Sequence, residues 1–63
     1  MTLRLSDPAY TARLAAFFDD LGYRSTLAAD GAVELEREIP REELEVYLRV
    51  WSVLEPLATV TVE

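Results

Sequence analysis

Five residue types that supply much of protein chemistry are missing from the sequence, which contains no Cys, His, Lys, Asn or Gln. Without Cys there is no disulfide and no thiolate, so stability has to come from packing. Without His or Lys, only a carboxylate could activate Ser6, Ser25 or Ser52 as a nucleophile. These absences predict a protein that is not an enzyme and that carries no cofactor.

Glycine is scarce as well, and the two glycines, Gly22 and Gly31, lie in different parts of the chain. A phosphate-cradling loop or a dinucleotide fingerprint needs several closely spaced glycines, so nucleotide binding by those routes is excluded. The adjacent acidic residues 19–20 and 42–43 fall on predicted helices, where neighbouring side chains diverge by about 100°. We interpret both pairs as solvated helix surfaces and expect no metal site.

Basic residues are few and dispersed. The net charge is −6, because twelve acidic residues outnumber six basic residues that are all Arg. Binding to a phosphate backbone draws on clustered Lys and Arg, so we expect no nucleic-acid partner. The use of Arg without Lys is typical of GC-rich bacterial genomes, and residues 42–51 look like a segment of short uncharacterised proteins from high-GC actinobacteria.

Long apolar runs are absent too. No window approaches the roughly 20 residues that span a bilayer, and the start, Met-Thr-Leu-Arg-Leu, lacks the pattern of a signal peptide. We therefore expect a cytoplasmic protein with no membrane partner. The whole chain, residues 1–63, is expected to form a single domain, because independently folding domains usually start at roughly 50 residues.

The first part of the chain predicts a strand followed by a helix. Residues 2–5 alternate polar and apolar, which is typical of a half-buried strand. Across residues 8–21 large apolar side chains recur at spacings of three and four, which indicates a helix. Asp7 or Ser6 can cap its start, and Gly22 permits the positive φ with which helices often end. The expected core stripe is Tyr10, Leu14, Phe17, Phe18 and Leu21.

Residues 23–37 predict a hairpin of two strands, 23–28 and 32–37. A two-residue turn would set Leu27 opposite a glutamate, whereas a three-residue loop ending in a left-handed Gly31 sets Leu27 opposite Val33. We predict the three-residue loop, because it buries Leu27 and leaves charged residues on the other face.

A second helix is predicted between Pro40 and Pro56. Val46, Val50 and Val53 lie beside its core stripe and widen the apolar arc to about 220°, which is more than one packed sheet covers. The stripe itself consists of Leu44, Tyr47, Leu48, Trp51 and Leu54.

Residues 57–63 alternate again and predict a fourth strand. The resulting order, βαββαβ, predicts an α+β ferredoxin-like fold with a four-stranded antiparallel sheet and two helices on one face. Its central strands are the first and the third, which would place Glu34 and Glu36 beside Arg4. Arg24 would flank the two glutamates on the other side. This open face has no aromatic residue on which an RNA-recognition module could stack bases.

Two short stretches frame the first predicted helix: Leu-Arg-Leu-Ser-Asp-Pro-Ala at residues 3–9 and Leu-Gly-Tyr at residues 21–23. Together with the element order they resemble the opening of ACT domains, which are small ferredoxin-like regulatory modules. ACT domains typically carry Gly where this chain has Ala after the proline. The resemblance implies a small metabolite bound at a subunit interface by the turn that contains Ser6, Asp7 and Pro8.

Two functions from different classes follow from these patterns. The first is a non-catalytic interaction module that self-associates or docks on a protein partner through the second helix, with Val46, Val50 and Val53, and through an exposed strand edge. The alternative is an ACT-like regulatory domain that binds a small metabolite at a subunit interface. A core of this size is expected to supply only about 3–5 kcal/mol, which favours association. The valines could instead pack on Ile39, on Leu57 or on the first helix.

Overall fold

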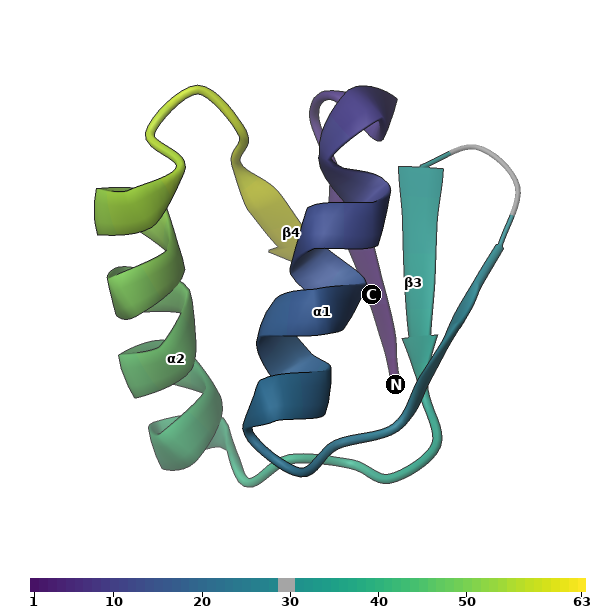
Figure 1. The fold of residues 1–63 in the computed structure, drawn as a ribbon. Helices are drawn as coiled ribbons and strands as arrows, with labels where there is room; N and C mark the ends of the chain where they lie inside the picture. The colour runs from purple at the N-terminus through teal and green to yellow at the C-terminus, as the bar shows by residue number, and fades with distance from the viewer. Residues whose placement is uncertain (29–30) are drawn as a thin grey trace.

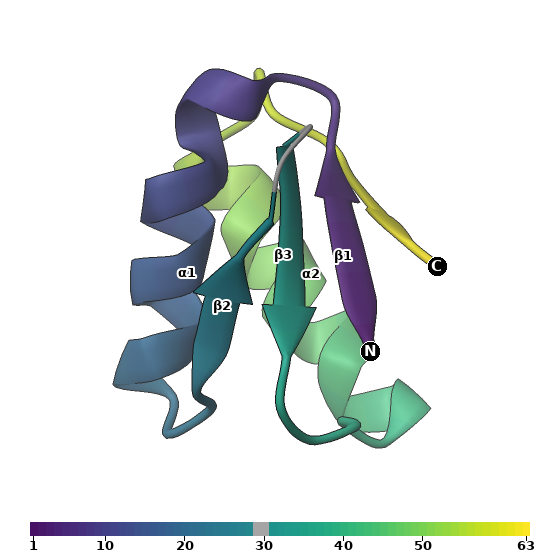
Figure 2. The same ribbon diagram turned by 90° about the vertical axis from the view of Figure 1, so that its right-hand side faces the viewer.

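The structure, a computed structural model, describes residues 1–28 and 31–63 and has the element order βαββαβ. Its four strands form one antiparallel sheet in the order β2-β3-β1-β4, and both helices lie on the same side of it (Figures 1 and 2). The predicted ferredoxin-like arrangement is thereby confirmed, with the first and third strands at the centre. The elements are β1 (Thr2–Leu5), a 3-10 turn (Pro8–Tyr10), α1 (Thr11–Asp20), β2 (Ser25–Leu27), β3 (Ala32–Leu35), α2 (Arg41–Leu54) and β4 (Val60–Val62).

The core lies between the sheet and the two helices. Leu14 and Phe18 of α1 are fully buried, and Leu44 and Trp51 of α2 are nearly so. They meet the inward-facing side chains of the central strands, which alternate along each strand as the period of two requires. These strand residues are Leu3, Leu5, Val33 and Leu35.

Three leucines that the patterns placed in the core are exposed instead. Leu21, Leu27 and Leu54 expose 39%, 54% and 60% of their surface, respectively. Leu21 follows the last residue of α1, Leu54 is the last residue of α2, and Leu27 ends the edge strand β2. Each therefore lies at the end of its element or at the edge of the sheet, where few neighbours cover it.

The start and the end of α1 follow the predicted signals, with one change. The Asp7 carboxylate accepts a hydrogen bond from the Ala9 N–H at 3.0 Å, but the turn that it caps is 3-10, and the α-helix begins at Thr11. At the other end Gly22 has φ 90°, and the N–H of Tyr23 donates to the Phe18 carbonyl at 2.9 Å. This bond is part of a Schellman motif, which satisfies carbonyls that the helix leaves free.

The hairpin has the predicted register. Leu27 lies opposite Val33 and Ser25 lies opposite Leu35, and Gly31 has φ 75°. The Ala28 N–H donates to the Ala32 carbonyl at 3.0 Å, which closes the pairing next to the loop. The rest of the predicted loop, residues 29 and 30, lies outside the described residues.

On the open face of the sheet the predicted pairing of Arg4 with Glu34 and Glu36 is wrong. The register sets Arg4 opposite Ala32, and its guanidinium bonds to Glu63, which follows β4. Glu34 lies opposite Thr2, and its carboxylate accepts a hydrogen bond from the Thr2 hydroxyl. This bond lowers the pKa of the Glu34 carboxyl. On the β2 side the predicted positions are confirmed: Thr26 lies opposite Glu34, and the Glu36 N–H donates to the Arg24 carbonyl at 3.1 Å.

Candidate functional site

One side of α2 presents a stripe of large aliphatic side chains to solvent. Val46, Val50, Val53 and Leu54 are between 47% and 77% exposed, and together we refer to them as the valine face. Spacings of four, seven and eight residues put all four on one side of the helix. An apolar stripe of this kind on a chain of 63 residues is typical of an interaction surface rather than of scattered exposure.

The opposite side of α2 is anchored in the core, which explains why the valine face points outward. The Trp51 indole N–H donates to the buried Ala58 carbonyl at 2.9 Å, and its ring packs edge-on against Phe17 at 5.6 Å. The alternative packing of the valines is not what the structure shows. Ile39 is buried in the core, whereas Leu57 is itself 81% exposed.

Polar contacts at both ends of α2 hold the helix against its neighbours. In its first turn Glu43 accepts the Tyr23 hydroxyl at 2.6 Å, and this bond is the main reason that the pKa of Tyr23 is raised to about 12. Just beyond its last turn Glu55 pairs with Arg13 at 2.9 Å and raises the pKa of that guanidinium. Both carboxylates thus already have a hydrogen-bond or ion-pair partner within the chain, and neither belongs to the valine face.

In the turn of residues 6–8, which the ACT resemblance marks as a ligand site, the side-chain oxygens of Ser6 and Asp7 already accept hydrogen bonds from backbone N–H groups of this chain. The Ser6 hydroxyl accepts the Thr59 N–H at 3.0 Å, and Asp7 caps the following 3-10 turn. Pro8 is exposed and packs close to Gly31. The three residues stay together because they are consecutive, and the metabolite site stays a prediction.

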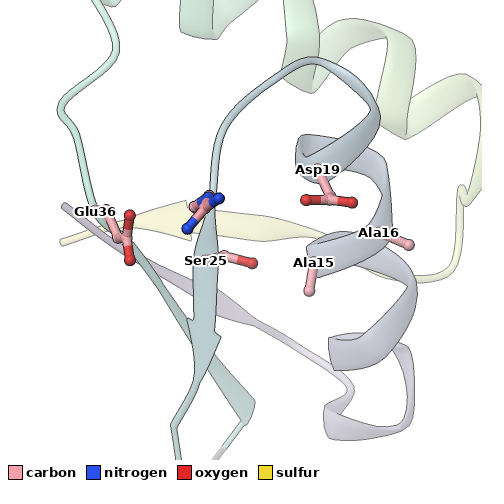
Figure 3. Close-up of a pocket in the computed structure, with 6 residues that line it drawn as sticks. Ala15, Ala16, Asp19, Ser25 and Glu36 are labelled. Atoms are coloured by element: carbon pink, nitrogen blue, oxygen red, sulfur yellow. The ribbon is translucent and has the colours of Figure 1, made fainter.

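A shallow polar hollow lies between α1 and β2 (Figure 3). Asp19 and Ser25 point into this space, while Glu36 lies on the far side of β2 from α1. Arg24 completes the charged lining. No hydrogen bond joins the Ser25 hydroxyl to Asp19 or Glu36, and no group of three or more metal-binding side chains occurs within residues 1–28 and 31–63. Its polar groups act as solvated surface.

Comparisons with family models, curated proteins and solved structures give no match for this chain. The argument for its function therefore rests on its own geometry. None of its described helices has the length and apolar character that crossing a membrane would need.

Sequence patterns did not reveal a second apolar surface, which runs between α2 and the edge strand β4. It includes a hollow of about 410 Å³ whose lining comes from both ends of the chain and from the middle of it. Only the fold brings these segments together, so no local period could have indicated the hollow. The apolar side chains in its lining are Met1, Ile39, Leu44, Leu48 and Val62.

Proposed function

We propose that this protein is a non-catalytic interaction module that binds a second copy of itself through the valine face of α2. The observation that carries the proposal is the exposure of Val46, Val50, Val53 and Leu54 on one side of a helix whose other side is already in the core. Burying a large aliphatic side chain stabilises by about 1.5–3 kcal/mol relative to leaving it exposed. Burial of two or more such side chains would therefore contribute as much free energy as the about 3–5 kcal/mol expected from the core of a domain of this size.

A second copy suits this surface because its pattern is symmetric about Val50. Val46 precedes Val50 by four residues and Leu54 follows it by four. In an antiparallel pair of α2 helices with a two-fold axis at Val50, Val46 of each copy therefore meets Leu54 of the other. The glutamates at the two ends are held by Tyr23 and Arg13 within each copy.

Sedimentation equilibrium of the wild type and of Val50→Glu tests this proposal. A buried glutamate without a partner would be costly, so Val50→Glu should lower the average mass well below that of the wild type. The matched control is Ala12→Glu, which adds the same charge at an exposed position of α1. A wild type that stays at 7.1 kDa up to high micromolar concentration, or equal masses for the two variants, would refute self-association through α2.

The dependence of self-association on salt concentration gives a second test that the valine face binds another copy of the chain. Each copy carries a net charge of −6, so two copies repel one another over distances that salt screens. Self-association should therefore strengthen as the salt concentration rises. Self-association that weakens with salt would contradict an apolar contact, because it would show that opposite charges hold the two copies together.

A further inference from the structure

The outer edge of β4 has hydrogen-bonding groups that the sheet does not use. In the pairing of β4 with β1, the Glu63 N–H donates to the Thr2 carbonyl, and the Ser6 N–H donates to the Thr59 carbonyl, both at 2.9 Å. Hydrogen-bonded and non-hydrogen-bonded pairs alternate along an antiparallel ladder. The backbone groups of Val60 and Val62 must therefore point away from β1, toward the free edge.

Hollows lie beside this edge on the helix side of the sheet. Val62, which is 44% exposed, lines the hollow of about 410 Å³, and the half-buried Val60 lines a smaller one of about 190 Å³. Leu48 of α2 contributes to both. The two hollows are thus neighbours, one beside each valine of the strand.

β4 is only three residues long, which limits edge pairing, but it lacks the other features that commonly protect an edge strand. Proteins block such edges with proline, with charged side chains that point inward, or with bulges. β4 is Val-Thr-Val, which is β-branched throughout, and it pairs with β1 in a continuous register. A short β-branched strand with an open edge is suited to accept another strand.

We propose that the outer edge of β4 pairs with β4 of a second copy, antiparallel, about a two-fold axis at Thr61. In this register Val60 of each copy lies opposite Val62 of the other, and each such pair exchanges both of its backbone hydrogen bonds. The sheets of the two copies become continuous. On the helix side, Val60 of one copy enters the hollow beside Val62 of the other, and Val62 enters the hollow beside Val60.

The same strand is the best occupant because the edge is complementary to itself. The outward-facing groups of Val60 and Val62 are symmetric about Thr61, so an identical antiparallel strand satisfies all of them. The two Thr61 side chains meet on the open face, which is a favourable cross-strand pair. Glu63 lies opposite Thr59 of the second copy rather than opposite its own counterpart, and Arg4 already pairs with it.

This contact goes beyond the proposed function, because it uses a different surface from the valine face. Val50 lies on the side of α2 that faces solvent, whereas Leu48 faces the β4 edge. Two separate self-complementary contacts would build an assembly larger than a dimer. Removal of the α2 contact by Val50→Glu should then leave a dimer held by β4, so the two proposals can fail independently.

Amide hydrogen exchange of Val50→Glu, followed by NMR over a range of protein concentrations, tests the β4 contact directly. The amides of Val60 and Val62 should exchange at least about tenfold more slowly once most chains are paired. The Thr61 and Glu63 amides are the internal control, because they face β1 and stay protected at every concentration. Exchange of Val60 and Val62 that does not depend on concentration would overturn the proposal.

A pair of variants at Val62 gives a second, independent test in the Val50→Glu background. Val62→Pro removes an outward N–H but no hydrogen bond to β1, and it should reduce the dimer to 7.1 kDa. Val62→Thr keeps the N–H and the shape of the side chain, and it should remain a dimer. A dimer of Val62→Pro whose circular dichroism matches that of Val62→Thr would refute the strand pairing, and the exchange experiment decides if Val62→Pro does not fold.

Discussion

Replacing Gly31 by Ala should destabilise the fold more than the same change at Gly22, although both glycines have positive φ, at 75° and 90°. A Cβ at Gly22 would meet no atom within 4 Å. A Cβ at Gly31 would stand 3.2 Å from the Cβ and Cγ of Pro8 and 3.3 Å from its Cα. The two substitutions therefore separate the cost of the backbone conformation from the cost of crowding.

The expected magnitudes follow from these contacts. A left-handed conformation costs a non-glycine residue about 1–2 kcal/mol, and the stiffer unfolded chain of an Ala variant offsets about 0.4–1 kcal/mol of that. Gly22→Ala should thus cost about 1 kcal/mol. At Gly31 the Pro8 ring cannot rotate away, and overpacking adds about 1 kcal/mol or more. The total is about 2 kcal/mol, and the β-branched Gly31→Val should cost more.

Thermal unfolding followed by circular dichroism at one protein concentration measures the difference. For a chain of this size about 1 kcal/mol corresponds to about 4–8 °C in Tm. Gly31→Ala should therefore lower Tm by about twice as much as Gly22→Ala, and Pro8→Ala should relieve part of the loss in the Gly31 variant only. Equal Tm values for the two glycine variants would refute the crowding argument, and an unchanged Tm for Gly31→Val would refute the left-handed loop.

Three further variants test individual contacts. Trp51→Phe leaves the buried Ala58 carbonyl without its donor and should cost about 1–3 kcal/mol in urea unfolding; an unchanged midpoint would contradict this. Because the pKa of Tyr23 is raised to about 12, chiefly by its bond to Glu43, the stability from this contact is complete below the ordinary tyrosine pKa. It should be lost as the pH rises toward 12, and Tyr23→Phe should show no such loss. The pKa of Glu63 is lowered by its bonded guanidinium, so the stability difference from Glu63→Gln should disappear as the pH falls through that lowered value; a difference that persists in acid would exclude this ion pair.

Local periods in the sequence were sufficient for the order and type of the elements. The stripe that includes Leu14 and Phe18 predicted α1, and the alternation at the start predicted β1, because burial of one face imposes the period of the element. Gly31 determined the hairpin register for the same reason, since a shift by one residue would have moved Val33 out of the core. The excess of apolar residues on α2 likewise anticipated the exposed Val50.

Only the tertiary structure decided what lies next to each face. Arg4 bonds to Glu63 rather than to Glu34, because the stagger between β1 and β3 depends on packing across the whole sheet and not on either strand alone. The alternation of apolar residues placed Leu27 on the buried face, but Leu27 is exposed because β2 is an edge strand. The hollow beside Val62 is lined by segments that are far apart in the chain. A sequence period specifies which side of an element is apolar, whereas the neighbours that cover this side are specified only when all elements have packed.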